Sequence, residues 1–182
     1  MSYLTEHRQK FDDLKHHLNN VEQIRREANG GNSILFAFPP EEESEYIYKV
    51  KELYISKAGF IDVSELLVKF IDSFEWSEFE KYYKDYRITP HVIFKSDDPS
   101  GDLFSSIIKA IETVASQGKI PILIRTGALY GTGIENIHIM EHSSIMSLLY
   151  PLVIFYPSKI KDENLFFLNF RLASRYRCTL IK

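Results

Sequence analysis

The sequence has little cysteine, little tryptophan and little excess charge of either sign. Cys178 is the only cysteine of the 182 residues. It therefore has no partner for an internal disulfide, which favours a reducing, cytoplasmic compartment. The net charge of −3 is unlike the basic footprint that is typical of nucleic-acid-binding proteins.

Long hydrophobic runs are missing as well. No stretch approaches the roughly 18 apolar residues that a transmembrane helix needs. The N-terminus carries charged residues from Glu6 onward and contains no apolar signal core. We therefore expect a cytoplasmic protein that makes no membrane contact.

The composition is that of an ordinary globular protein, with 45% hydrophobic and 26% charged residues. Pro121–Ile124 and Leu152–Phe155 are short apolar runs, typical of parallel strands buried on both faces. Residues 134–149 between them predict a crossover helix. We expect a single-domain α/β fold over residues 1–182, with a mostly parallel, Rossmann-like sheet flanked by helices and without a P-loop.

Other segments extend this pattern on both sides. Apolar residues at helical spacing predict one N-terminal helix over about residues 3–28, ahead of a core over about residues 33–182. Further strands are predicted at Ser33–Phe38, at Gly59–Val63 and, at a sheet edge, at Tyr176–Ile181. Helices are predicted to begin at Glu41–Glu45, with Tyr46, Ile47, Val50, Leu53 and Tyr54 facing inward, at Ser64 as N-cap, and near Leu103, with Leu103, Ile107, Ile111 and Val114 facing inward. His91–Phe94 is predicted as a strand or a buried loop, and Ser158–Asn164 as a polar turn.

The turn after the first central strand is the first candidate for a ligand site. Arg125, Thr126, Gly131 and Gly133 follow a strand and precede a helix, which is the setting of phosphate-binding loops. However, Ile134-Glu135-Asn136 replaces the Lys and Ser or Thr of a P-loop, and Glu135 would bring negative charge to an anion site. A plain strand-to-helix turn is the favoured interpretation, and no cofactor is predicted.

No catalytic or metal-binding pattern is complete. His138 and His142 have the i, i+4 spacing of zinc ligands, but Ile139 stands where metalloproteases have Glu, and no third ligand is evident. Ser143-Ser144 follows His142 without a nucleophile elbow. Cys178 follows Arg175 and Arg177, which could lower the pKa of its thiol, but it is more easily explained as a small core residue. The carboxylate pair Asp97-Asp98 falls in a turn.

Two features predict contact with another macromolecule. Residues 74–86 are rich in aromatic side chains, of which Phe79, Tyr82, Tyr83 and Tyr86 share a helix face expected in the core. Trp76 falls off that face and is a candidate exposed anchor for a protein partner.

The tail is the second feature. Residues 159–182 hold six basic and two acidic residues, whereas residues 41–52 and 72–85 are net acidic. Arg171, Arg175 and Arg177 could orient a protein partner or touch a nucleic-acid backbone. Scattered solvation charge is the simpler alternative.

Several strings in the second half of the chain occur in a familiar order. They are LIRTGALY at 123–130, VIFYPS at 153–158, NLFFLNF at 164–170 and SRYRCTLI at 174–181. Together they resemble the BrxB family of the BREX phage-defence systems, whose pattern has a strand ending in Thr-Gly, a strand entering Phe-Tyr-Pro-Gly and a closing Tyr-Tyr-Arg. Gly131 and Ser158 depart from the family's Pro and Gly, and His138 is displaced from its Arg-x-His.

The resemblance implies a non-catalytic auxiliary subunit. Its expected partner is a PglZ-like protein of the alkaline-phosphatase superfamily, together with other BREX subunits such as the BrxC-type ATPase and the adenine methyltransferase; nucleic acid would be contacted only within that complex. Two alternatives stay open. One is a nucleotide- or phosphate-binding α/β enzyme that uses Arg125, Thr126, Gly131 and Gly133, and the other is a DNA-contacting subunit that uses Arg171, Arg175 and Arg177.

Overall fold

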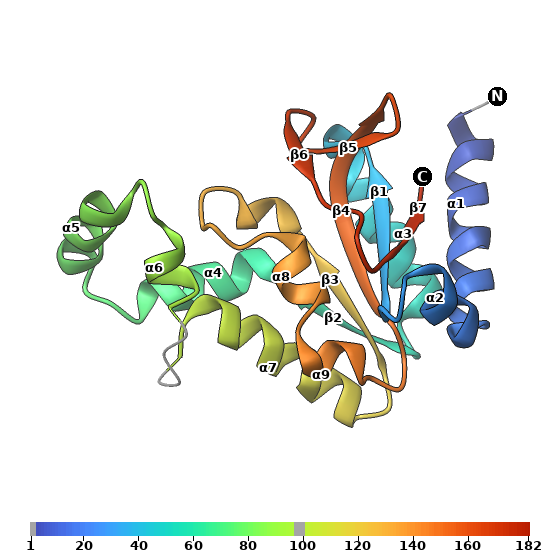
Figure 1. Ribbon diagram of the computed structural model, residues 1–182, viewed down its shortest axis with the longest axis horizontal. Helices are drawn as coiled ribbons and strands as arrows, with labels where there is room; N and C mark the ends of the chain where they lie inside the picture. The colour runs from blue at the N-terminus through green and yellow to red at the C-terminus, as the bar shows by residue number, and fades with distance from the viewer. Residues whose placement is uncertain (1–2, 97–100) are drawn as a thin grey trace.

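A parallel sheet occupies the centre of the molecule (Figure 1). The computed structural model describes residues 3–96 and 101–182. Five strands lie side by side in the order β2-β3-β4-β1-β7, and each neighbouring pair is parallel. They are β1 (Ser33–Phe38), β2 (Ala58–Asp62), β3 (Ile120–Ile124), β4 (Leu152–Lys161) and β7 (Thr179–Ile181). The predicted mostly parallel, Rossmann-like α/β fold is confirmed.

The central strands are buried because helices cover both faces of the sheet. Every residue of β1 and of β3 is buried, as the continuous apolar runs predict for a two-sided sheet. Along β1, Ile34 and Phe36 belong to one hydrophobic core, and Leu35 and Ala37 belong to the other. This alternation follows from the two-residue period of a strand.

One face is covered by the N-terminal part of the chain. It carries α1 (Tyr3–Leu18), α2 (Val21–Glu27) and α3 (Glu43–Tyr54), which follows the short 3₁₀ helix η1 (Pro40–Glu42). The centre of this core is a stack of Phe36 on Phe155, with ring centroids 4.6 Å apart. Tyr46 from α3 packs edge-on against Phe36 at 5.7 Å. Leu53, predicted to face inward on α3, is instead 48% exposed.

The opposite face is covered by the helices that follow β2 and β3. They are α4 (Val63–Asp72), α7 (Leu103–Ser116), α8 (Asn136–Met140) and α9 (Ser143–Met146). Ile107, Ile111 and Ile139 from these helices are completely buried in the second core. The predicted inward face of α7 is thereby confirmed.

An arm projects from the body beyond the end of α4 (Figure 1). It consists of α5 (Trp76–Tyr86) and α6 (His91–Phe94). Phe79 is buried and its ring lies 6.3 Å from that of Phe94. The expectation that four aromatic residues of α5 face the core holds for Phe79 and for the partly buried Tyr82, but it is wrong for Tyr83 and Tyr86, which are exposed. The segment His91–Phe94 is a single helical turn, neither a strand nor a loop.

β4 is longer than the sequence predicted. Beyond its pairing with β1 it continues to Lys161 and turns back through β5 (Asn164–Phe167) and β6 (Arg171–Ala173), which form an antiparallel extension. The segment Ser158–Asn164, predicted as a polar turn, is therefore mostly strand. The turn itself is Asp162-Glu163, both with positive φ (49° and 63°).

Three helix boundaries also differ from prediction. The N-terminal helix is broken near Asn20, whose side-chain amide donates to the His16 carbonyl and so competes with the helix. The predicted crossover helix 134–149 is likewise two short helices, α8 and α9, separated at His142. The N-cap of α4 is Asp62 instead of Ser64, because its carboxylate accepts from the backbone N–H groups of Ser64 and Glu65.

Lys10 closes the edge of the sheet where β7 ends. β7 pairs with β1 only as far as Phe36. The Lys10 ammonium donates to the next carbonyl, that of Ala37, at 3.3 Å, and the residue is 5% exposed. Burial lowers the pKa of Lys10, although Glu6 partly offsets this effect.

No helix in the described parts of the chain is long and apolar enough to span a bilayer.

Gly31 provides a test of the packing beside β1. A Cβ at this position would overlap the backbone carbonyl of Arg177, just before β7. We expect Gly31→Ala to lower the free energy of unfolding by about 1–3 kcal/mol, because backbone cannot move aside as a flexible side chain can. The midpoint of urea unfolding, followed by circular dichroism, measures this change. In the control Gly127→Ala the nearest atoms lie 3.6 and 3.7 Å away, and equal losses in the two variants would contradict the close packing.

Candidate functional site

The carboxyl ends of the parallel strands lie at one edge of the sheet, where open α/β sheets usually bind ligands. Asp62 ends β2, Arg125 follows β3, and the β4–β6 extension rises above this edge (Figure 1). The residues that sequence analysis placed in the turn after β3 are therefore in the expected location. The contacts of these residues within the chain determine which of their groups remain available to a ligand.

Arg125 is held by an ion pair. Its backbone is left-handed, with φ 55° and ψ 38°, which costs an arginine on the order of 1 kcal/mol. The guanidinium Nε lies 3.1 Å from the Asp62 carboxylate. Burial raises the pKa of the nearby Glu43 carboxyl, Arg125 partly lowers it, and Asp62 raises it again. Arg125 thus already faces acidic groups of its own chain.

Thr126 continues the sheet instead of facing a ligand. It opens the 3₁₀ helix η2 (Thr126–Leu129) and is completely buried. The β3–β4 pairing ends at Leu123 and Ile154. Beyond that point the Thr126 hydroxyl donates to the Phe155 carbonyl at 2.6 Å. The Thr126 hydroxyl therefore extends the hydrogen bonding between the β3 and β4 segments.

The two glycines shape the turn that follows. Gly131 and Gly133 have φ of 83° and 76°, which favours glycine at both positions. The Thr132 hydroxyl donates to the Leu129 carbonyl at 2.7 Å and accepts from the Ile134 N–H at 3.1 Å. A Cβ at Gly133 would lie 2.8 Å from the backbone nitrogen of His91. These contacts agree with the favoured interpretation of a plain strand-to-helix turn.

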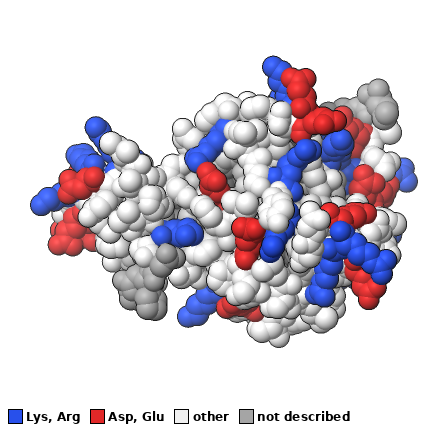
Figure 2. Space-filling view, in the orientation of Figure 1, with Lys and Arg blue, Asp and Glu red and all other residues white. Residues whose placement is uncertain are grey.

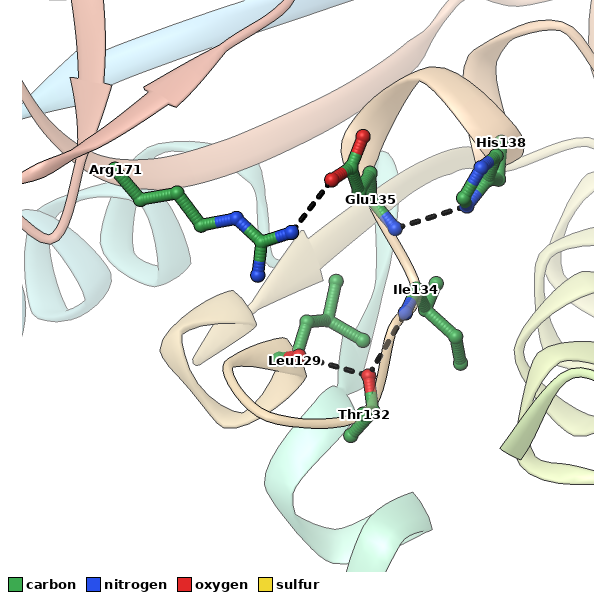
Figure 3. Close-up of polar contacts among 6 residues, drawn as sticks. All are labelled: Leu129, Thr132, Ile134, Glu135, His138 and Arg171. Atoms are coloured by element: carbon green, nitrogen blue, oxygen red, sulfur yellow. Dashed lines mark hydrogen bonds and ion pairs between the residues drawn. The ribbon is translucent and has the colours of Figure 1, made fainter. Parts of the chain in front are cut away.

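Glu135 connects this turn to the β4–β6 extension. Its carboxylate accepts from the Arg171 guanidinium at 2.6 Å, and its N–H donates to His138 Nδ1 at 3.0 Å (Figure 3). Burial lowers the pKa of His138, with a smaller contribution from Lys95, so this imidazole is suited to accepting. Both members of the Glu135–Arg171 pair are nearly half exposed, and such pairs contribute about 0.2–1 kcal/mol.

A narrow pocket lies beneath the Glu135–Arg171 pair. Its walls include Leu129, Ile134 and Phe167, and Tyr156 from β4 lines it. Burial raises the pKa of Tyr156 well above its usual range, Glu135 adds to the shift and Arg171 opposes it. The phenol therefore stays neutral at physiological pH.

Exposed apolar side chains lie on the segments that line this pocket or directly adjoin its lining residues. We call Tyr130, Phe170, Arg171 and Leu172 the hairpin surface, because Arg171 and Leu172 lie in β6 and Phe170 directly precedes it. Tyr130, Phe170 and Leu172 are 53%, 61% and 66% exposed. The rings of Tyr130 and Phe170 meet edge to face with centroids 5.4 Å apart. Apolar side chains around an arginine are the composition of protein–protein interfaces.

The predicted partner residues do not form one surface. Arg171 belongs to the hairpin surface, whereas Trp76 is 66% exposed on the projecting arm, as predicted for an anchor. Arg177 Nε lies 3.6 Å from the Glu141 carboxylate, and its guanidinium lies over the Tyr176 ring. Arg175 is exposed and makes no ion pair within the described residues.

The charges do not form a basic surface on the face that Figure 2 shows, where lysine and arginine are interspersed with acidic residues. Arg171 and Arg177, two of the three arginines considered for DNA contact, have carboxylate partners. Nucleic-acid backbones are bound through unneutralised positive charge. This arrangement therefore lends the DNA-contacting alternative no support.

The remaining chemical candidates are separated. His138 lies in α8 and His142 precedes α9, so they do not share one helix face; His142 Nδ1 instead lies 2.8 Å from the Ser144 hydroxyl. Within residues 3–96 and 101–182 no three His, Cys, Asp or Glu side chains are placed to hold a metal ion. Asp97-Asp98 lies outside the described residues.

Sequence reasoning missed most of the hairpin surface. Tyr130, Phe170 and Leu172 were not singled out, because an apolar residue in sequence is normally assigned to the core. The available signal was Leu172 directly after Arg171 and ahead of the polar segment 174–177. Comparison of the chain with protein-family models, with curated proteins and with solved structures finds no match.

Thr126 provides a test of the turn. We expect Thr126→Val to lower the free energy of unfolding by about 1–3 kcal/mol, because the Phe155 carbonyl loses a buried hydrogen bond. Urea unfolding measures the change. Thr113→Val is the matched control, since Thr113 makes a similar bond to Lys109 at the exposed surface. If both substitutions changed stability equally, the buried bond would have no special role.

Cys178 provides a test of thiol reactivity. Burial raises its pKa to about 12, and Arg175 only partly opposes this. At pH 8 the thiolate fraction is then far below that of an ordinary cysteine, so we expect Ellman's reagent to react roughly 100- to 1000-fold more slowly than with a free thiol. The same protein in urea is the control. An equally fast reaction of the folded protein would indicate an exposed, activated thiol.

Proposed function

We propose that this protein is a non-catalytic adaptor subunit that binds a protein partner through the hairpin surface. The observation that carries the proposal is the exposure of Tyr130, Phe170 and Leu172 beside Arg171, at the edge of the sheet where α/β proteins place their sites. Burying these side chains against a partner would remove apolar area from water, which drives association.

The hairpin surface is also suitably rigid. Phe167 on β5 stacks on Tyr156 of β4 with ring centroids 4.6 Å apart. β6 is therefore held to the core through two antiparallel pairings. A preordered surface loses less entropy on binding than a flexible loop does.

The partner is proposed from the sequence resemblance. A BrxB-like role in a BREX system implies a PglZ-like protein of the alkaline-phosphatase superfamily as the first partner, within a cytoplasmic complex. The groups at the carboxyl edge support an adaptor: Arg125, Thr126 and Gly133 are occupied by contacts within the chain. A phosphate that bound Arg125 would also lie close to the Asp62 carboxylate, whose negative charge would oppose it.

Co-purification of the tagged chain with a co-expressed PglZ-like protein tests the proposal. We expect the two proteins to elute together from a size-exclusion column. Leu172→Lys should weaken the complex at least tenfold, because it places a charge in the apolar contact. Binding can be titrated by calorimetry or surface plasmon resonance.

Leu149→Lys is the matched control. Leu149 is 76% exposed, more than Leu172, but it precedes β4 at the opposite edge of the sheet. A complex that Leu172→Lys and Leu149→Lys leave equally intact would exclude the hairpin surface. Failure of the wild-type chain to bind would exclude the PglZ-like partner itself.

A further inference from the structure

The exposed side of α5 carries four residues in a line. Trp76, Glu80, Tyr83 and Arg87 are spaced i, i+4, i+7 and i+11, which places them along one stripe of a helix. Arg87 is the C-cap and keeps helical φ and ψ. At 1.5 Å per residue the stripe is roughly 16 Å long. We call these four residues the α5 stripe.

Packing of α5 on the arm fixes where the stripe points. Phe79 is 5% exposed, and its ring lies within 6.3 Å of Phe94, so this side of the helix faces inward. Trp76 and Tyr83 flank Phe79, with ring centroids 6.2 Å from it in each case. The two residues are nevertheless 66% and 37% exposed. The stripe is thus the outward margin of an aromatic cluster.

The side chains of the α5 stripe are ordered so that two copies of the stripe complement each other when they lie antiparallel. It reads aromatic, acidic, aromatic, basic. When a second α5 lies antiparallel, Trp76 comes opposite Arg87 and Glu80 opposite Tyr83, and a two-fold axis forms each pair twice. An arginine over an indole is a favourable cation–π contact, and a tyrosine hydroxyl can donate to a carboxylate.

We propose that the chain self-associates through α5, with a second copy of the chain bound antiparallel along the α5 stripe. A parallel pairing would set Arg87 against Arg87 and Glu80 against Glu80, so the charges select the antiparallel arrangement. The arm projects away from the sheet (Figure 1), which leaves room for two bodies on either side of the contact. The inference is independent of the adaptor role, which uses the hairpin surface.

The expected dimer is weak. Two helices of this length bury less than the roughly 1,200 Å² of a standard stable interface. Association should therefore occur in the micromolar range and raise the local concentration of two hairpin surfaces in a larger complex. Glu80 already pairs with Lys84 at 2.7 Å within its own helix, so part of its charge is satisfied in the monomer.

Trp76 reports on this contact directly, because it is the only tryptophan in the chain. Sedimentation equilibrium and tryptophan fluorescence would be measured on the whole protein from low to high micromolar concentration. We expect the mass to rise towards that of two chains, and the emission maximum to shift to shorter wavelength with lower quenching by acrylamide. Both changes should have the same midpoint.

Substitutions test the antiparallel register. Arg87→Glu should weaken the dimer at least tenfold, and Arg26→Glu, at an arginine exposed on α2, should leave it unchanged. Trp76→Arg alone should also abolish association, because it faces Arg87 of the second copy. Combining Trp76→Arg with Arg87→Trp exchanges the two partners and should restore the dimer.

Three outcomes would overturn the proposal. The first is a wild-type chain that stays monomeric at the highest concentration. The second is a dimer that Arg87→Glu and Arg26→Glu affect equally. The third is a monomeric chain whose PglZ-like complex is weakened by Trp76→Ala, which would assign the α5 stripe to that partner instead of a second copy.

Discussion

The burial of β1 on both faces is the constraint on which the rest of the fold depends. Its alternate side chains enter two separate cores, so the N-terminal helices and the helices after β2 are both packed against one strand. The stacked rings of Phe36 and Phe155 join β1 to β4 at the centre of one core. A loosened β1 would therefore expose apolar surface on both sides at once.

β4 connects the buried sheet to the antiparallel extension at the surface. Its first half is completely buried between β3 and β1, and its second half forms the base of the antiparallel extension. The hairpin surface is consequently joined to the core through continuous strand pairing. The loop after β3 is attached to the same extension through Glu135 and Arg171. Two segments far apart in sequence thus present one continuous edge.

The two-sided strands could be predicted because continuous apolar runs have few alternatives. The β4–β5 hairpin could not, since its turn is Asp162-Glu163, which lacks the glycine that marks such turns. The helix breaks at Asn20 and His142 depend on local hydrogen bonds that compete with periodicity. For the site, the location of Arg125 and Thr126 was predictable, but their pairing with Asp62 and Phe155 required the fold. The exposure of Trp76 was predicted, whereas the sequence signal for Leu172 was only its place between Arg171 and the polar segment 174–177.

The position of β1 in the sheet also bears on how the protein is made. β1 emerges early during synthesis, yet both strands that flank it, β4 and β7, come from the last third of the chain. Until they are translated, both edges of β1 are unpaired, a condition that invites aggregation. Cotranslational folding from the N-terminus therefore cannot complete the sheet.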